Sequence, residues 1–262
     1  MILDDITAAV ARRLVEDKQK VSPEQMKAKA LGAPKKEGFP FARALKQPGL
    51  SFICEVKKAS PSKGLIAPDF PYTDIAREYE QAGAAAISVL TERDYFLGSG
   101  QYLQEIAQAV ATPVLRKDFI IDEYQIYEAR VLGASAVLLI CAVLDDARLT
   151  QFLQLAHDLG LSALVEAHDE DEVRRALAAG AQIIGVNNRN LKDFTVSLNT
   201  SCRLRPLVPP SVLFVAESGI KTAADTARLR EHGVDAVLIG ETFMRSADKK
   251  AMLDELAGKQ HG

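Results

Sequence analysis

Helical segments that end in glycine and are followed at once by apolar runs recur along this chain. The pattern occurs at 79–83 before 86–90, at 130–133 before 136–140, at 178–180 before 183–186 and at 230–233 before 236–240, with a looser copy at 157–165. Glycine suits the residue after a helix because it adopts the left-handed conformation at little cost. An apolar run without alternation is typical of a strand covered on both faces. We therefore expect consecutive β/α units around a parallel sheet.

The apolar runs predict eight strands, near 51–57, 85–91, 113–117, 135–140, 161–166, 182–187, 212–216 and 235–239. The helical patterns fall near 73–82, 100–110, 123–132, 146–159, 169–179, 222–232 and 247–257, with a short helix expected within 194–206. Eight such units close a barrel, so the predicted fold class is α/β, a (β/α)8 TIM barrel. An open doubly wound sheet usually has a glycine-rich turn after its first strand, which Lys57–Gly64 does not supply.

The first fifty residues precede the first predicted strand and form an N-terminal extension. Ile2, Ile6, Val10 and Leu14 recur every four residues and predict one amphipathic helix. This helix is expected either to cap the bottom of the barrel or to fold over its mouth. The length of 262 residues suits a single domain, with 1–50 as the extension and 51–257 as the barrel.

Composition and charge narrow the class of partner. The net charge is −3 with both signs interspersed, whereas a nucleic-acid-binding protein is expected to carry clustered basic residues. No run approaches the ~20 apolar residues of a membrane span, and the N-terminus lacks the regions of a signal peptide. We expect a cytoplasmic protein that acts on a small molecule, without nucleic acid or membrane as partner.

The residues that commonly bind metals are scattered. Cys54, Cys141 and Cys202 form no Cys-x-x-Cys pair, so neither a zinc site nor a disulfide framework is expected, and the first two are expected to be buried. The histidines are expected on the surface or at helix ends; they are His157, His168, His232 and His261. No metal or other cofactor is predicted.

Ionisable side chains gather where the predicted strands end. Because alternate residues of a strand share a face, the groups expected to point into the barrel or follow its strands are Glu55, Lys57, Lys117, Glu166, Asn187, Arg189 and Glu217. In barrels of this kind the active site lies at the C-terminal ends of the strands. Ammonium and carboxylate groups held together there shift each other's pKa values and can act as acids and bases.

A second signal follows the last two strands. Ser218-Gly219 comes after the seventh strand and Gly240-Glu241 after the eighth. Phosphate sites in barrels of this type are built from these two loops and the start of a short helix. The alternative is that the glycines only form ordinary turns.

Taken together, these segments resemble one family, the indole-3-glycerol-phosphate synthases. The resemblance rests on Glu55–Gly64, Leu90–Glu92, Leu115–Phe119, Leu164–His168, Gly185–Leu191, Ala216–Ile220 and Leu238–Glu241. The most specific parts are the Lys-x-Ser-Pro-Ser run, Arg-Lys-Asp-Phe and Asn-x-Arg. The resemblance extends from about residue 50 to the C-terminus and is loose before it. Glu241 stands where a small residue such as serine often occurs in the family.

The resemblance implies a reaction and roles for individual residues. The substrate is 1-(2-carboxyphenylamino)-1-deoxyribulose 5-phosphate, whose ring closure releases carbon dioxide and water in tryptophan biosynthesis. Lys117 is the expected acid for the carbonyl oxygen and Glu166 the base of the dehydration. Lys57, helped by Ser60 or Arg189, holds the carboxylate, and Glu55 orients a lysine through an ion pair. Either lysine is a candidate for the second proton donor.

The remaining residues are expected to bind the substrate. Asn187, Arg189 and Glu217 contact the sugar hydroxyls or the anthranilate part. The phosphate lies on the backbone N–H groups of Ser218, Gly219, Gly240 and Glu241, with Lys57 nearby. Phe96 and Phe119 form an apolar wall for the aromatic ring, unless they belong to ordinary core packing.

Two other functions fit the same scaffold. A phosphoribosyl isomerase would use an acid/base pair of the Cys/Asp kind and would need no second inward lysine. A non-catalytic sugar-phosphate-binding barrel would bind its ligand without turnover, since a fold alone does not establish activity. The pairing of Lys57 with Lys117 speaks against the isomerase, and the complete set of acid/base residues speaks against the non-catalytic barrel.

Overall fold

Eight parallel strands close into a barrel in the computed structural model, which describes residues 2–34, 37–190 and 193–259. Each predicted strand is confirmed to within one residue at either end, and because β1 pairs with both β4 and β10, the open doubly wound alternative is wrong. Leu191 and His261 lie outside the described residues. The strands are β1 (Ser51–Val56), β4 (Ala86–Leu90), β5 (Val114–Lys117), β6 (Ala136–Ile140), β7 (Ser162–Ala167), β8 (Ile183–Asn187), β9 (Leu213–Glu217) and β10 (Ala236–Ile239).

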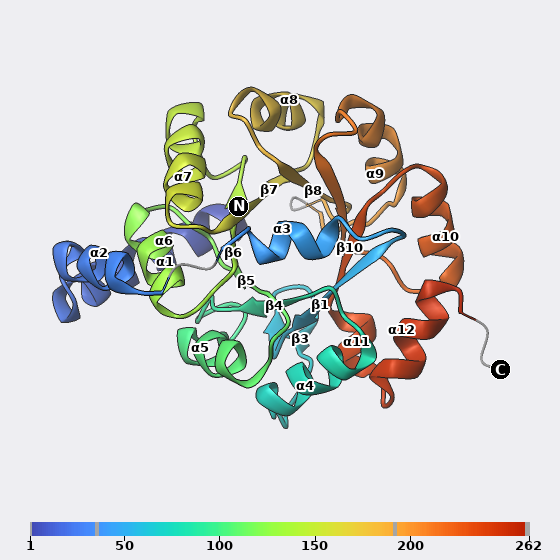
Figure 1. Ribbon diagram of the computed structural model, residues 1–262, viewed down its shortest axis with the longest axis horizontal. Helices are drawn as coiled ribbons and strands as arrows, with labels where there is room; N and C mark the ends of the chain where they lie inside the picture. Colours follow the sequence, from blue (N-terminus) through green and yellow to red (C-terminus); the bar gives the residue numbers. More distant parts are fainter. Residues whose placement is uncertain (1, 35–36, 191–192, 260–262) are drawn as a thin grey trace.

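Helices surround the strands, as Figure 1 shows, and follow the predicted order. They are α4 (Tyr72–Ala82), α5 (Gly100–Ala109), α6 (Glu123–Val131), α7 (Asp146–Asp158), α8 (Glu170–Ala178), α9 (Asn199–Leu204) with a 3-10 turn (Arg205–Leu207), α10 (Ala223–Glu231) and α12 (Lys249–Ala257). The glycines after four of these helices have the left-handed φ angles that the sequence pattern predicted, between 74° and 94°.

The interior of the barrel changes from apolar to polar along each strand. The lower layers are filled by side chains such as Ile53, Leu115 and Leu164, which belong to one buried cluster. Two residues further along the same faces come Glu55, Lys117 and Glu166, as the alternation of strand side chains requires. The barrel therefore places its ionisable groups in one layer above a dry core.

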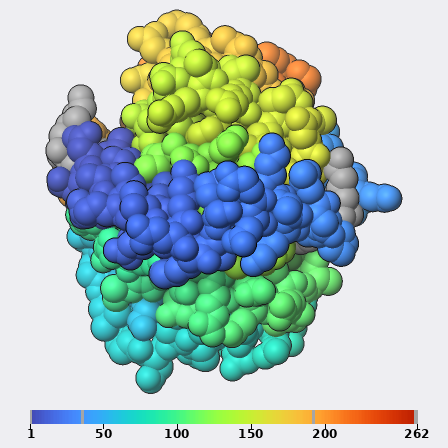
Figure 2. Space-filling model, turned by 90° about the vertical axis from the view of Figure 1, so that its left-hand side faces the viewer, coloured from blue at the N-terminus to red at the C-terminus, as the bar shows by residue number. Residues whose placement is uncertain are grey.

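The N-terminal extension contains three helices, so the prediction of one helix was incomplete. They are α1 (Ile2–Lys20), α2 (Pro23–Gly32) and α3 (Pro40–Leu45). Phe41 and Leu45 of α3 are buried in the bottom of the barrel, whereas Ile2, Leu3 and Ile6 of α1 line the cavity at its mouth. Both predicted locations are thus occupied, by different helices. The extension runs as a band across one side of the molecule (Figure 2).

Two short elements lie beside the mouth of the barrel. The loop after β1 forms a hairpin of β2 (Ala59–Ser60) and β3 (Gly64–Leu65), which the sequence did not predict. The helix α11 (Glu241–Arg245) follows β10 directly. In the part of the chain that the structure describes, every helix is too short or too polar to span a bilayer.

Candidate active site

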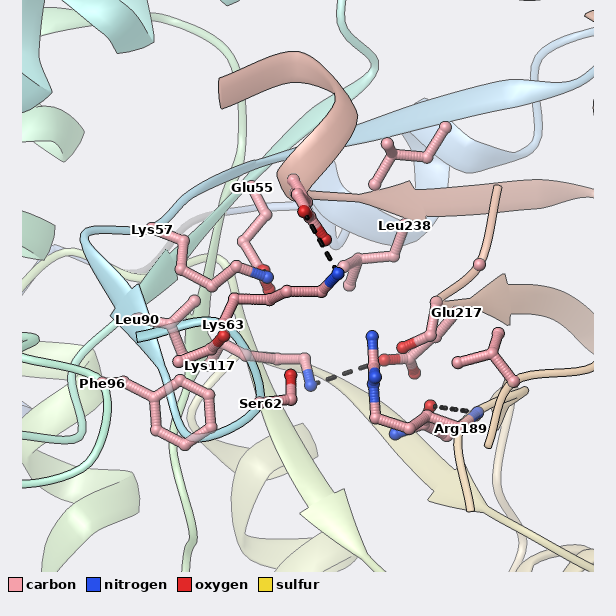
Figure 3. A pocket seen from close by; sticks show the side chains of 18 of the residues that line it. Glu55, Lys57, Ser62, Lys63, Leu90, Phe96, Lys117, Arg189, Glu217 and Leu238 are labelled. Atoms are coloured by element: carbon pink, nitrogen blue, oxygen red, sulfur yellow. Dashed lines mark hydrogen bonds and ion pairs between the residues drawn. The ribbon is translucent and has the colours of Figure 1, made fainter. Parts of the chain in front are cut away.

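A cavity of about 600 Å³ opens at the C-terminal ends of the strands, within the usual size range for small-molecule sites. It brings together every residue that the sequence predicted for the catalytic and substrate-binding site, although their individual roles remain predictions. These residues are Glu55, Lys57, Ser60, Phe96, Lys117, Phe119, Glu166, Asn187, Arg189, Glu217, Ser218, Gly219, Gly240 and Glu241. Figure 3 shows Phe96 on one side of this cavity, Arg189 and Glu217 on the other, and the Lys117 amine between them.

Lys57 and Glu55 form an ion pair at the end of β1. The Lys57 Nζ lies 2.6 Å from the Glu55 Oε1, and the Ser88 hydroxyl donates to the other carboxylate oxygen over 3.5 Å. Glu55 is buried, so its carboxylate is held in one orientation by these two partners. The pair fixes the amine of Lys57 at the wall of the cavity.

Lys117 lies between two buried carboxyl groups from β7 and β9. Its Nζ is 3.2 Å from the Glu166 Oε2 and 3.4 Å from the Glu217 Oε2. Burial alone would lower the pKa of Lys117, but Glu166, Glu217 and Glu55 outweigh it and hold that pKa above its usual value. Burial would likewise raise the pKa of Glu166, which Lys117 instead holds below its usual range. Lys117 is therefore charged at neutral pH and faces an ionised Glu166.

Glu217 differs from the other carboxyl groups of the cavity. Burial, together with the charges of Glu166 and Glu55, raises its pKa to about 8 against the opposing effect of Lys117. Glu217 therefore retains its proton at neutral pH, mainly because it is buried. The Glu217 Oε1 has no hydrogen-bond partner within the described residues and is buried.

A glycine in β8 provides the space for the Glu217 carboxyl group. A Cβ added to Gly185 would lie 2.1 Å from the Glu217 Oε1 and 3.1 Å from a methyl carbon of Leu164. Real Cβ atoms essentially never approach another heavy atom so closely. Any side chain at position 185 would therefore push Glu217 away from its place beside Lys117.

We expect Gly185→Ala to lower kcat/KM by roughly tenfold to 10²-fold, since displacement of an active-site group by about 1 Å can cost that much. Steady-state assays with product detection measure the effect. Gly32→Ala in α2 is the matched control, because a Cβ there meets nothing within 4 Å. Equal activity of the two variants would show that Glu217 tolerates the displacement.

The second oxygen of Glu166 has partners that the sequence interpretation missed. The Asn187 Nδ2 donates to the Glu166 Oε1 over 3.3 Å, and the His168 Nε2 lies 3.3 Å from the same oxygen. The prediction of a surface or helix-end position is therefore wrong for His168, which is partly buried between Glu166 and Glu172. It is confirmed for His157, which is exposed, and for His232, which ends α10.

The loops after β9 and β10 meet at one corner of the cavity. The Thr242 hydroxyl donates to the Ile220 carbonyl oxygen over 2.9 Å, which ties the two loops together. A Cβ at Gly240 would lie 2.5 Å from the Glu55 Oε1 and 2.7 Å from the Lys57 Nζ. Only glycine at position 240 therefore allows the Lys57–Glu55 ion pair to pack against the loop after β10. Lys63, from the β2–β3 hairpin, pairs with Glu241 over 3.5 Å. Lys63 was not singled out, although it lies within the Glu55–Gly64 segment.

Apolar side chains form the opposite wall. The rings of Phe96 and Phe119 lie with centroids 6.0 Å apart at 39°. The buried Glu92 carboxylate fixes the loop that carries Phe96, because it accepts the backbone N–H groups of residues 94, 95 and 96 over 2.7 to 3.1 Å. Arg13 of α1 reaches the same carboxylate at 2.6 Å. Helix α1 and the aromatic wall are therefore joined through Glu92.

The donor set of this cavity suits proton transfer better than metal binding. Within residues 2–34, 37–190 and 193–259, no three His, Cys, Asp or Glu side chains lie close enough to hold a metal ion. The carboxylates of the cavity are instead neutralised by lysines. Cys54 and Cys141 are buried as expected and do not line the cavity.

The chain is similar to known proteins along nearly its whole length. The family model "Indole-3-glycerol phosphate synthase" matches residues 3–256. Indole-3-glycerol phosphate synthases from Ruminiclostridium cellulolyticum and Endomicrobium trichonymphae are each 57% identical to it, over 98% of this chain and 99% of theirs. Among solved structures, a 3-hexulose-6-phosphate synthase matches with a TM-score of 0.63 at 17% identity, over 80% of this chain and 99% of that one. This last similarity concerns the fold alone.

Proposed function

The chain belongs to the indole-3-glycerol phosphate synthase family, and from that premise we propose how its residues carry out the reaction. The enzyme is a carboxy-lyase of tryptophan biosynthesis. It converts 1-(2-carboxyphenylamino)-1-deoxyribulose 5-phosphate to indole-3-glycerol phosphate with loss of carbon dioxide and water. The site residues and their roles, described next, are our proposal.

The substrate spans the cavity from the phosphate corner to the aromatic wall. The phosphate accepts hydrogen bonds from the backbone N–H groups of Ser218, Gly219, Gly240 and Glu241, with Lys57 nearby. The anthranilate ring lies against Phe96 and Phe119, which face the cavity from the other side. Held at both ends, the substrate is folded so that its ring carbon approaches the ribulose carbonyl, and this proximity lowers the barrier.

Ring closure begins with attack of the ring carbon that bears the carboxylate on the ribulose carbonyl carbon. Lys117 donates its proton to the carbonyl oxygen as negative charge develops there. An ammonium with a raised pKa keeps its proton until that moment, because only the developing alkoxide is basic enough to take it. Lys57, helped by Ser60 or Arg189, holds the carboxylate in place, and Glu55 orients Lys57 through their ion pair.

Loss of carbon dioxide then restores the aromatic ring, and loss of water completes the indole. Glu166 removes a proton from the carbon next to the nitrogen, while a lysine protonates the departing hydroxyl group. Lys117 and Lys57 remain alternative donors for this second proton. Asn187, Arg189 and Glu217, which line the cavity, bind the sugar hydroxyls or the anthranilate part.

The observation that carries this proposal is the position of the Lys117 amine between the carboxyl groups of Glu166 and Glu217, inside a cavity that also holds the Lys57–Glu55 pair. A phosphoribosyl isomerase of the Cys/Asp kind gains no support, because neither Cys54 nor Cys141 lines the cavity. We further propose that residues 1–262 form one domain and that the enzyme acts in the cytoplasm on this substrate, without nucleic acid.

We expect the purified protein to turn over its substrate in the presence of a metal chelator and with no added cofactor. Lysine and glutamate side chains supply every proton transfer of the proposed sequence. The measurement is the rise of indole fluorescence with and without chelator. Binding of substrate without any product would favour the non-catalytic sugar-phosphate barrel, and loss of turnover in chelator would show that a metal takes part.

A further inference from the structure

We propose that His168 is a positioning residue for Glu166, and that Glu172 holds it in that role. The three side chains form a partly buried row, Glu172–His168–Glu166, which runs from the start of α8 to the cavity. The inference deepens the proposed function and rests on the role of Glu166 as the base of the dehydration. His168 itself does not line the cavity, so it acts on the reaction through Glu166.

The imidazole ring is hydrogen-bonded at Nδ1 and, at its buried Nε2, approaches a carboxylate as an ion pair without hydrogen-bond geometry. The His168 Nε2 lies 3.3 Å from the Glu166 Oε1, and the Nδ1 lies 3.0 Å from the Glu172 Oε2. The same Glu172 oxygen accepts the backbone N–H of His168 over 2.8 Å, which closes a ring of contacts around residue 168. The side chains of His168 and Glu172 are 18% and 15% exposed, so solvent competes little with these contacts.

A carboxylate on each side favours the imidazolium form of this histidine. Burial would lower the pKa of His168, but its contacts with Glu166 and Glu172 outweigh burial and raise that pKa to about 10. Glu166 thus has a cation on each oxygen, with Lys117 at Oε2 and His168 at Oε1. A carboxylate paired on both oxygens stays ionised and keeps one orientation.

Other polar and charged groups also face this row and affect the protonation of Glu166 and His168. In the cavity, the neutral Asn187 donates to Glu166, and Glu217, which shares Lys117 with Glu166, keeps its proton at neutral pH. Behind the row, the Cys141 thiol contacts the Glu172 carbonyl oxygen, and Arg175 donates to the Cys141 carbonyl oxygen over 3.0 Å. Among these, only Lys117 and His168 place a cation within 4 Å of Glu166 in the described part of the chain.

The second cation matters between the two proton transfers. Once Lys117 has given its proton to the carbonyl oxygen, it no longer neutralises Glu166. His168 then remains as the positive partner that keeps Glu166 ionised and aimed at the carbon from which it must take a proton. When Glu166 accepts that proton, the imidazolium stays paired with Glu172.

The test compares pH profiles of kcat for the wild type and His168→Asn between pH 5 and 9. Loss of the cation raises the pKa of Glu166, so Glu166 becomes protonated, and inactive as a base, at higher pH. We expect the ratio of variant to wild-type kcat to fall steadily as the pH is lowered from 8 to 5, and to approach about tenfold per unit of pKa shift once the pH lies below the pKa of Glu166 in both proteins. KM should change little. A constant ratio across this range would overturn the inference, because a merely structural role lowers activity by the same factor at every pH.

Two further measurements keep the inference testable if His168→Asn fails to fold. Glu172→Gln should shift the profile in the same direction by a smaller amount, and His157→Asn, at an exposed histidine of α7, should leave it unchanged. Imidazole nitrogen NMR of the wild type should show both ring nitrogens of His168 protonated at pH 7.5, and a neutral ring would refute the proposal.

If Glu166→Gln turns over normally, the proposed base is wrong; if that variant is impaired while the profiles stay parallel, only the role of His168 is wrong.

Discussion

Replacing Lys117 with alanine is expected to lower kcat by at least ~10²-fold, as loss of a general acid should. The amine of Lys117 is the group that lies between the Glu166 and Glu217 carboxyl groups in the ionisable layer of the barrel. Without it, the carbonyl oxygen must take its proton from water, and the developing alkoxide loses its nearest cation. The measurement is steady-state formation of indole fluorescence, with KM determined alongside kcat.

The same substitution changes the charge balance of the buried layer, and this effect must be separated from catalysis. Glu166 and Glu217 are 3% and 2% exposed, so removal of Lys117 leaves two buried carboxyl groups facing each other. Breaking a buried pair can cost about 3–5 kcal/mol of stability unless a carboxyl group takes up a proton. Circular dichroism and thermal unfolding therefore accompany the assay, with Lys46→Ala at an exposed position near the bottom of the barrel as control. Turnover like the wild type by folded Lys117→Ala would remove Lys117 from the role of acid.

The strand pattern was predictable because the barrel satisfies one local rule repeatedly. A strand covered on both faces must be apolar throughout, and a glycine after the preceding helix turns the chain toward it. The inward direction of Lys117 and Glu166 followed from counting two residues beyond Leu115 and Leu164. The position of the ionisable layer could therefore be predicted from the alternation of side chains along each strand alone.

The division of the N-terminal extension was missed although its signal was present. Ser22 accepts the Gln25 N–H and Gln25 accepts the Ser22 N–H, which is a capping box, and Pro23 occupies the first turn. These residues begin a new helix after Lys20. The periodicity of the apolar residues from Ile2 to Leu14 concerns only α1, so it could not reveal the helices that follow.

The contacts of individual site residues were less predictable because they join strands that are distant in sequence. Glu166 and His168 are two residues apart, so a shared direction could have been inferred, but the second partner Glu172 lies on the next helix. The raised pKa of Glu217 depends on burial and on charges from β1 and β7 at once. Such a value follows from the closed arrangement of the barrel and has no signature in any one segment.

Replacing Glu166 with glutamine is expected to impair the dehydration and to lower kcat by ~10²- to 10⁴-fold, the range for loss of a general base. Glutamine has nearly the same shape, so the contacts with Asn187 and the packing of β7 are largely retained, whereas the capacity to accept the proton is lost. Lys117 keeps Glu217 as a partner and remains able to promote ring closure. The block should therefore fall after carbon dioxide has left.

Because the block is expected after decarboxylation, the prediction can be tested specifically at the dehydration step. Rapid quenching followed by mass spectrometry should reveal an intermediate that has lost carbon dioxide but still carries the hydroxyl group. Glu170→Gln, the same change at a partly exposed position at the start of α8, should accumulate none and retain normal turnover. If Glu166→Gln instead stopped the reaction before decarboxylation, Glu166 would act in ring closure through its ion pair with Lys117. Normal turnover without an intermediate would place the base elsewhere in the cavity.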